Sequence, residues 1–211
     1  MIPVFIPFVN RIDLLQRAVN SCRESEAYIN IINNSGAPLS LFSHYIYTPI
    51  VPLTFTQTQN AMLKLCGNYP FYLFMHSDAE AGENTVQQLI HLAKQCQHQE
   101  RKWGAIFTNY DSLAAFNTGA MRAIGGWDTL FSWYESDCDT YRRLRLAGYE
   151  TIESNLPVKH EPSQTLKSDP EIKRRVDLEI PFRHAMYLAK WGGPPGEEKF
   201  TMPYNRTPSI I

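Results

Sequence analysis

The sequence lacks the short motifs that mark several large enzyme classes. It contains no G-x-G-x-x-G and no G-x-x-x-x-G-K-[ST], so a dinucleotide oxidoreductase or a P-loop nucleotidase loses its main support. It also contains no G-x-S-x-G and no zinc-ligand pattern. Its four cysteines show no C-x-x-C spacing, and we expect reduced, half-buried thiols of a cytosolic protein at Cys22, Cys66, Cys96 and Cys138.

The sequence also has no long apolar run and no excess of one charge. No window approaches the roughly 18 consecutive apolar residues of a membrane helix. The N-terminal MIPVFIPFVNR has no basic n-region, so we interpret it as a first strand and not as a signal peptide. Twenty Lys and Arg stand against 21 Asp and Glu, a formal charge of −1, which argues against broad binding to nucleic acid. The 211 residues are enough for one ordinary domain.

Segments with strand character and segments with helical periodicity alternate along the chain. Apolar, β-rich runs predict strands at 3–8, 27–32 and 103–108 and a buried strand that ends just before His76, with shorter candidates at 44–48, 114–117, 149–153 and 156–159. Apolar residues spaced by three and four predict helices at 12–22, at 56–66, from about 84, and at 135–147. This alternation predicts an α/β fold with a mostly parallel sheet flanked by helices.

Four polar clusters follow predicted strands. The richest is His76-Ser77-Asp78-Ala79-Glu80, directly after a buried apolar run, and the others are Asn10-Arg11, Asn33-Asn34-Ser35 and His160-Glu161. Because ligands bind outside the carboxyl ends of parallel strands, we expect these clusters to converge. Two carboxylates and two imidazoles (Asp78, Glu80, His76, His160) favour a Mn²⁺ or Mg²⁺ site completed by substrate phosphates. The cation would offset the cost of desolvating the carboxylates.

Each of these signals has a plainer structural alternative. Asp78 and Glu80 could precede a helix, whose N-terminus favours carboxylates by roughly 0.3–1 kcal/mol each. His160 alone could be a hydrogen-bonded loop residue, and Asn33-Asn34-Ser35-Gly36 could be an ordinary turn. The basic run 142–145 could be a solvated helix face paired with Asp139.

A 25-residue run from Gly125 to Tyr149 resembles the family 2-type glycosyltransferases of the GT-A fold. That family has G-G-[FW]-D, then E-D-x-D, then R-L-R-x-A-G-Y. Here the corresponding segments are GGWD at 125–128, YESDCD at 134–139 and RRLRLAGY at 142–149. The resemblance implies a GT-A fold and a general base at Asp137. Ser136 stands where the family has a glutamate, and Glu135, one position earlier, is the second catalytic candidate.

The same family has a D-x-D element after an apolar strand, which holds the metal ion on the diphosphate of a nucleotide-sugar. This sequence reads His76-Ser77-Asp78 in that register and Asp78-Ala79-Glu80 in the next. The resemblance implies Mn²⁺ or Mg²⁺ bound by His76, Asp78, Glu80 and His160. It also implies that the donor is contacted by eight residues: Pro7, Arg11, Asn34, Asn60, Ser77, Asp78, Asn117 and Gly119.

The implied activity is transfer of a hexose or deoxyhexose from a UDP-sugar to a hydroxyl of a glycan or glycoprotein, with an inverting or a retaining outcome. No nucleic-acid partner is expected. A UDP-sugar-binding domain without activity is one alternative. A sugar nucleotidyltransferase is another, although 8–11 (FVNR) lacks the glycines that such enzymes use for a triphosphate.

The resemblance covers roughly residues 2–162, so we expect a catalytic core at 1–162 and a C-terminal extension at 163–211 that packs on it or lids it. The segment 191–196 (WGGPPG) is either a lid or a plain loop. Trp127, Trp133 and Tyr134 form either an acceptor-stacking wall or core packing. The length and the ending KWGGPPGEEKF are similar to small viral and bacterial members, which implies a cytoplasmic protein, in the host if viral.

Overall fold

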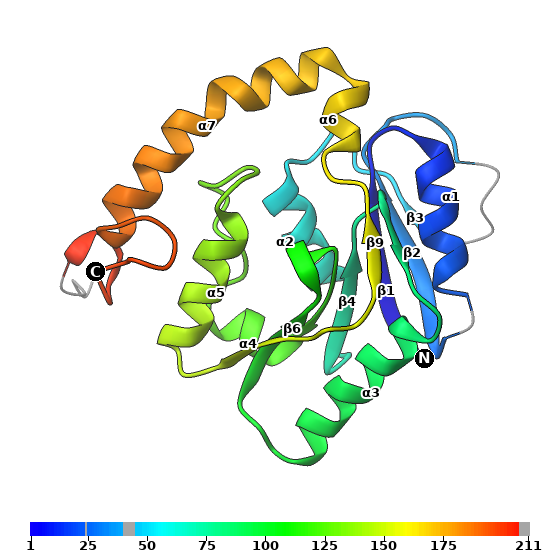
Figure 1. Ribbon diagram of the computed structural model, residues 1–211, viewed down its shortest axis with the longest axis horizontal. Helices are drawn as coiled ribbons and strands as arrows, with labels where there is room; N and C mark the ends of the chain where they lie inside the picture. Colours follow the sequence, from blue (N-terminus) through cyan, green and yellow to red (C-terminus); the bar gives the residue numbers. More distant parts are fainter. Residues whose placement is uncertain (24, 40–44, 207–211) are drawn as a thin grey trace.

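A seven-stranded sheet forms the centre of the computed structural model, which describes residues 1–23, 25–39 and 45–206 (Figure 1). The strand order is β3-β2-β1-β4-β7-β6-β8. Neighbouring strands are parallel except at β7, which is antiparallel to both β4 and β6. The sheet is therefore mostly parallel and mixed, as predicted. Its strands are β1 (Ile2–Phe8), β2 (Ala27–Asn33), β3 (Tyr45–Tyr47), β4 (Phe71–Met75), β6 (Trp103–Phe107), β7 (Leu113–Asn117) and β8 (Glu150–Glu153).

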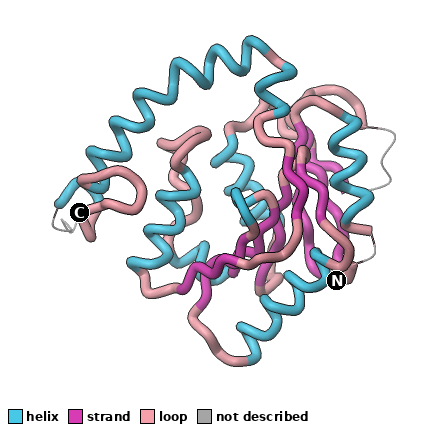
Figure 2. The backbone as a smooth tube through the Cα atoms, viewed as in Figure 1, coloured by secondary structure: helices cyan, strands magenta, loops and turns pink. Residues whose placement is uncertain are grey.

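Strand β1 contributes to two hydrophobic cores, because successive side chains of a strand point to opposite faces. Val4 and Ile6 belong to the core that includes α1 (Ile12–Ser21) and α3 (Thr85–His98). Phe5 belongs to the core that includes α2 (Phe55–Leu65), α4 (Thr118–Ala123) and α5 (Ser136–Leu146). Helices thus cover both faces of the sheet (Figure 2). Burying each large apolar side chain contributes about 1.5–3 kcal/mol.

The predicted helices are confirmed to within one or two residues at most ends, and local capping explains one start. At α2 the Thr54 hydroxyl accepts a hydrogen bond from the Gln57 backbone amide, and the Gln57 side chain accepts one from the Thr54 amide. This reciprocal capping box satisfies two donors that a helix start otherwise leaves open. The candidate strand 44–48 is confirmed at 45–47, while residue 44 lies outside the described residues.

A small second sheet pairs β5 (Ala79–Ala81) with β9 (Val158–His160). The two strands are antiparallel, and Ala79 lies opposite His160. Strand β5 was not predicted, because its sequence Ala-Glu-Ala carries no β-rich character. This pairing places His160 beside the end of β4, and it is the local reason why two distant polar clusters meet.

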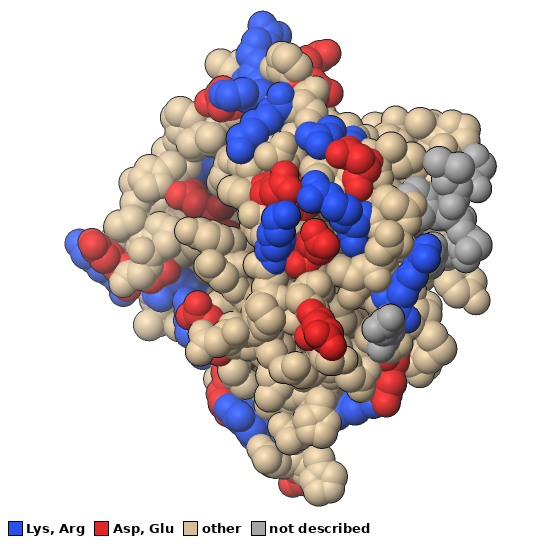
Figure 3. All heavy atoms as spheres, turned by 45° about the vertical axis from the view of Figure 1, so that its right-hand side comes forward, with Lys and Arg blue, Asp and Glu red and all other residues tan. Residues whose placement is uncertain are grey.

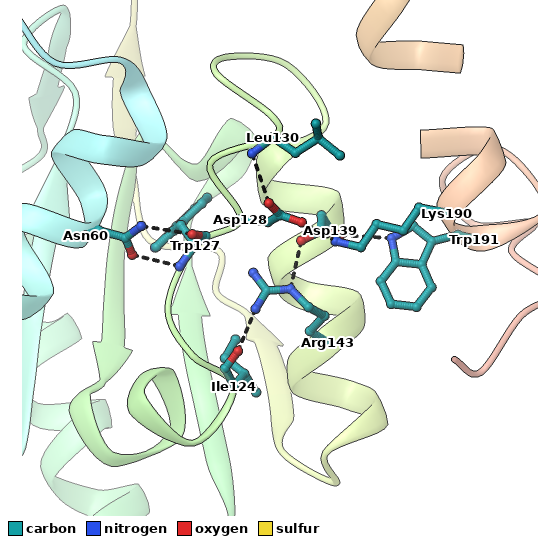
Figure 4. Close-up of polar contacts among 9 residues, drawn as sticks. All are labelled: Asn60, Ile124, Trp127, Asp128, Leu130, Asp139, Arg143, Lys190 and Trp191. Atoms are coloured by element: carbon teal, nitrogen blue, oxygen red, sulfur yellow. Dashed lines mark hydrogen bonds and ion pairs between the residues drawn. The ribbon is translucent and has the colours of Figure 1, made fainter. Parts of the chain in front are cut away.

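The C-terminal segment crosses from one side of the sheet to the other (Figure 1). It consists of α6 (Gln164–Ser168), α7 (Pro170–Trp191) and a final 3-10 turn (Pro203–Asn205). The end of α7 is held against α5 by a buried cluster (Figure 4). Lys190 Nζ lies 2.6 Å from a carboxylate oxygen of both Asp128 and Asp139, and the Trp191 indole donates a 2.9 Å hydrogen bond to Asp139.

This cluster changes two interpretations of the sequence. The predicted pair between Asp139 and the basic run is present, since Arg143 Nε lies 2.8 Å from Asp139. The surrounding helix face is not solvated, because Asp139 is fully buried and the Arg143 side chain is only 16% exposed. The segment 191–196 is not a lid: Trp191 is buried in the cluster, and no residue of the segment lines the cavity described below.

The surface and the thiols agree with the composition. Lys and Arg are interspersed with Asp and Glu on the face seen in Figure 3. Cys22, Cys66 and Cys96 are buried free thiols, and Cys138 is a half-buried one. Among the helices of the described residues, none combines the length and the apolar character that crossing a bilayer requires.

Candidate metal and donor site

A cavity of about 350 Å³ opens where the parallel strands β1, β2 and β4 end. Pro7 lines it from the end of β1, Asn34 from the residue after β2, and Ser77 and Asp78 from the turn after β4. The predicted convergence of polar clusters at the carboxyl edge of the sheet is therefore present for these residues.

Three predicted metal ligands come together in this cavity: His76, Asp78 and His160. One ligand atom from each lies within 4.8 Å of the others. Asp78 Oδ1 is 3.3 Å from His160 Nε2 and 3.8 Å from His76 Nδ1. The two imidazole centroids are 5.2 Å apart. His160 reaches this position through the β5–β9 pairing, and the His76 amide is fixed by the Ser112 carbonyl at 3.0 Å.

The protonation states of His76 and Asp78 suit the binding of a cation. Burial lowers the pKa of His76, which packs against Phe55 and Phe74, so its imidazole is neutral at pH 7. Burial alone would raise the pKa of Asp78, but the His160 imidazole and the other donors outweigh it and lower that pKa. An ionised carboxylate and neutral ring nitrogens are the protonation states that bind metals.

Two other predicted ligands to the metal or donor lie apart from the trio. Glu80 is half exposed and faces Arg17 at 3.9 Å, beside a separate hollow of only about 10 Å³. Arg11 forms a bidentate ion pair with Asp13 and donates to the Gln164 side chain at 3.3 Å. Neither Glu80 nor Arg11 lines the main cavity.

The two predicted asparagines of the first half have structural partners. Asn34 lines the cavity, and its amide bridges the Thr58 hydroxyl at 3.0 Å and the Leu53 backbone amide at 3.1 Å. Asn60 instead holds the backbone of Trp127, donating to its carbonyl at 2.9 Å and accepting from its amide at 2.8 Å (Figure 4). Asn60 thus supports the cavity wall from behind.

Asn117 and Gly119 lie at the opposite edge of the sheet from the trio, contrary to the expected donor contact. Strand β7 is antiparallel to β4, so Asn117 pairs with Phe71, the first residue of β4, and not with its last. The Asn117 side chain caps α4 by accepting from the Ala120 amide at 3.0 Å. The prediction rested on the family resemblance alone, and the antiparallel direction of β7 places both residues away from the cavity.

The two catalytic candidates differ in their surroundings. Asp137, in the first turn of α5, lines the cavity. Glu135 does not line it, and its carboxylate oxygen lies 2.6 Å from His184 Nδ1 of α7. All three residues of the expected aromatic wall, Trp127, Trp133 and Tyr134, line the cavity. Trp127 also packs in the core, since it is only 4% exposed and contacts Phe55 and Phe116.

Sequence reasoning named no residue in two parts of the wall, although it expected the C-terminal extension to pack on or lid the core. Asp111 lines the cavity from a 3-10 turn (Asn109–Asp111) that no periodicity predicts. The start of the C-terminal segment also lines it, through Pro162, Ser163, Thr165, Leu166 and Val176. That segment is tied to the trio, because the Gln164 backbone amide donates to Asp78 Oδ2 at 3.2 Å.

Comparison with known proteins rests on structure alone, because no protein-family model and no curated protein sequence matches the chain. The crystal structure of residues 1–349 of TarS from S. aureus matches 73% of this chain with a TM-score of 0.57 and 10% identity. The same TarS fragment in complex with UDP-GlcNAc matches 77% with a TM-score of 0.55. GalNAc-T7 with UDP, GalNAc and Mn²⁺ matches 75% with a TM-score of 0.60 and 11% identity.

The chain spans 58%, 60% and 43% of the lengths of these three structures. At 10–11% identity the likeness is one of architecture. It agrees with the mixed sheet and with the GT-A fold that the GGWD run at 125–128 implied. The chain has the GT-A fold of the glycosyltransferases.

Proposed function

We propose that the chain is a metal-dependent glycosyltransferase that moves a sugar from a UDP-sugar to a hydroxyl of a glycan acceptor. The observation that carries this proposal is the His76–Asp78–His160 trio in a cavity that Asp137 also lines. Solved structures with this fold include complexes with UDP, with UDP-GlcNAc, and with UDP and Mn²⁺, which supports a UDP-sugar as the donor.

The trio fits a divalent cation by its donor chemistry. Asp78 offers a carboxylate, and His76 and His160 offer imidazole nitrogens, a set that suits Mn²⁺ better than the all-oxygen preference of Mg²⁺. The buried Nδ1 of His160 has no hydrogen-bond partner within the described part of the chain. Glu80 would have to leave Arg17 to become a fourth ligand. When bound, the cation supplies Lewis-acid stabilisation of the charge on a diphosphate leaving group.

The charge of the cavity supports a strict need for that cation. Three aspartates line it (Asp78, Asp111 and Asp137), and among the described residues no lysine or arginine does. A diphosphate would therefore meet uncompensated negative charge without a cation. The same lack of basic residues weighs against a nucleotidyltransferase, which must hold a triphosphate.

Asp137 is the proposed general base. The acceptor oxygen bonds to the anomeric carbon while the bond from that carbon to the diphosphate oxygen breaks, so the electron pair leaves with UDP. The acceptor proton passes to Asp137, which must lie within hydrogen-bond reach of the hydroxyl. Glu135, bound to His184, orients the start of α5 in this proposal. In the retaining alternative Asp137 faces the oxocarbenium-like centre, and the product anomer distinguishes the two.

The C-terminal extension 163–211 completes the proposal as a cover for the core 1–162. Its first residues line the cavity, and Asn10, Arg11 and Asp78 hold them by hydrogen bonds of 3.2–3.3 Å. Pro7, Asn34 and Ser77 remain the proposed donor contacts. We further propose a hexose or deoxyhexose donor, a glycan or glycoprotein acceptor, and action in the cytoplasm, that of the host for a viral chain.

The test is UDP release from a panel of UDP-glucose, UDP-galactose, UDP-GlcNAc and UDP-rhamnose. Each donor is run with Mn²⁺, with Mg²⁺ and with EDTA, on the wild type, Asp78→Asn and Asp177→Asn. The last is a matched control, because Asp177 is an exposed aspartate of α7 paired with Lys173. We expect release from one donor class with Mn²⁺, loss in EDTA and in Asp78→Asn, and no change in Asp177→Asn.

Two other results have defined meanings. No release from any donor, together with UDP binding in Mn²⁺, would replace the proposal with a UDP-sugar-binding domain without activity. Release that persists unchanged in EDTA would refute the metal dependence.

A further inference from the structure

An unusual backbone turn directs Asp111 into the cavity. The 3-10 turn after β6 places Tyr110 at φ 55° and Asp111 at φ 51°, two successive non-glycine residues in the left-handed region. This conformation is uncommon for such residues and is retained where the surroundings enforce it. The turn leaves the Tyr110 side chain 78% exposed at the rim, and Asp111 lines the cavity together with Asp137.

Asp111 and Asp137 line the same cavity, and in the described part of the chain no basic side chain there balances their charge. Within the described residues, neither carboxylate forms a salt bridge, and no lysine or arginine lines the cavity. The titratable groups that face Asp111 are Asp137 and Tyr141 of α5 and Glu153 of β8. Tyr141 is itself buried, and its hydroxyl faces the Asp111 carboxyl.

These surroundings disfavour two full negative charges. Burial raises the pKa of Asp111 to about 7, and the charge of Asp137 adds to that rise. A carboxyl group whose pKa is raised this far keeps its proton up to near-neutral pH. Asp111 can therefore act as a hydrogen-bond donor in the cavity.

Resting on the proposed transferase function, we propose that Asp111 is an acceptor-binding residue in the cavity that Asp137 also lines. Asp111 donates a hydrogen bond to one oxygen of the acceptor, and Asp137 accepts the hydrogen bond of the reacting hydroxyl. The ligand class is a neutral pyranose with neighbouring hydroxyls. An acceptor with a carboxylate or phosphate beside the reacting hydroxyl is disfavoured, because both carboxyl groups would face its negative charge.

The first readout needs no turnover. Carbon-13 NMR of labelled aspartate carboxyls follows the titration of Asp111, identified by its loss in Asp111→Asn. We expect one carboxyl that titrates near neutral pH in the wild type and at lower pH in Asp137→Asn. An Asp111 that titrates at the pH of an ordinary exposed aspartate would overturn its role as a hydrogen-bond donor.

The second readout compares KM for the acceptor with KM for the donor. Asp111→Ala removes the donor group, and we expect the acceptor KM to rise about tenfold, the size of one lost hydrogen bond to a positioned group, with little change in the donor KM. Asp111→Asn keeps an N–H donor in the same place and should recover most of that loss. Equal acceptor KM values in the wild type and Asp111→Ala would overturn the acceptor role.

The two readouts separate this inference from the function on which it rests. If UDP-sugar is turned over but Asp111 does not titrate near neutral pH, the donor role of Asp111 is refuted and the transferase function stands. The titration without any turnover refutes the transferase and, with it, the acceptor role of Asp111.

Discussion

Replacing Lys190 by methionine should destabilise the protein strongly, because Lys190 is a buried cation between two carboxylates. Its side chain is 5% exposed, and its Nζ lies 2.6 Å from Asp128 and 2.6 Å from the fully buried Asp139. Methionine keeps the length and the apolar stem and removes the charge. Asp139 then loses one of its partners in a site where water cannot replace it.

The magnitude follows from what remains around Asp139. Breaking a buried ion pair by removing one partner costs roughly 3–5 kcal/mol. Arg143 and Trp191 still donate to Asp139 in the variant, at 2.8 and 2.9 Å, so its charge is not left alone. We therefore expect Lys190→Met to lose about 2–4 kcal/mol. In a chain of this size each kcal/mol lowers Tm by about 2–4 °C, so Tm should fall by about 4–16 °C.

The assay is urea unfolding followed by tryptophan fluorescence, with thermal melting as a second probe. Lys173→Met is the matched control, because Lys173 lies on the same helix, is 56% exposed and pairs only with the exposed Asp177. We expect it to change stability by less than about 0.5 kcal/mol. If Lys190→Met were no more destabilising than Lys173→Met, the buried cluster would not be what holds the end of α7 against α5.

Three smaller predictions test other parts of the fold. Gly126→Ala should lower the free energy of unfolding by about 1–3 kcal/mol more than Gly125→Ala, measured by chemical denaturation. Both glycines have φ +77°, but a Cβ at Gly126 would lie 2.5 Å from Asn60 Oδ1, whereas one at Gly125 would meet open space. Equal costs would contradict this. Thr54→Ala should lower the free energy of unfolding by about 1 kcal/mol, because it removes the hydroxyl of the α2 capping box. An unchanged midpoint of urea unfolding would contradict the stabilising role of this cap. The pKa of Asp111 is about 7 in the folded state and 3.8 in the unfolded state, so the free energy of unfolding falls as pH rises from about 4 to 7. Asp111→Asn should remove about 2 kcal/mol of that fall, which is half the full linkage value because the carboxyl is partly exposed. If stability changed with pH in the same way in both proteins, this prediction would be refuted.

The local pattern was sufficient to predict most elements and the edge of the sheet that carries the site. Apolar runs and helical spacing depend on nearby residues, so β1, β4, α1 and α5 could be predicted within a residue or two. The carboxyl-end rule then identified the position of Asp78 without knowledge of strand order. The meeting of His160 with Asp78 depends on the β5–β9 pairing, which no local pattern encodes.

The rest could not be predicted because it depends on strand direction and on single backbone angles. Asn117 lies at the far edge only because β7 is antiparallel, and its apolar run LAAFN reads the same in either direction. Asp111 enters the cavity through two left-handed residues that could equally have been part of a plain loop. The Lys190 cluster joins positions more than fifty residues apart, beyond the reach of helical periodicity.

The central claim is that His76, Asp78 and His160 bind a divalent cation. Electron paramagnetic resonance measures it directly, because the six-line signal of free Mn²⁺ is lost on binding. We expect one Mn²⁺ bound per chain in the wild type, tighter in the presence of UDP. His160→Ala should weaken the affinity at least about tenfold, and His98→Ala, which removes an exposed histidine of α3, should not change it. Binding of Mn²⁺ with equal affinity by the wild type and His160→Ala would contradict the claim.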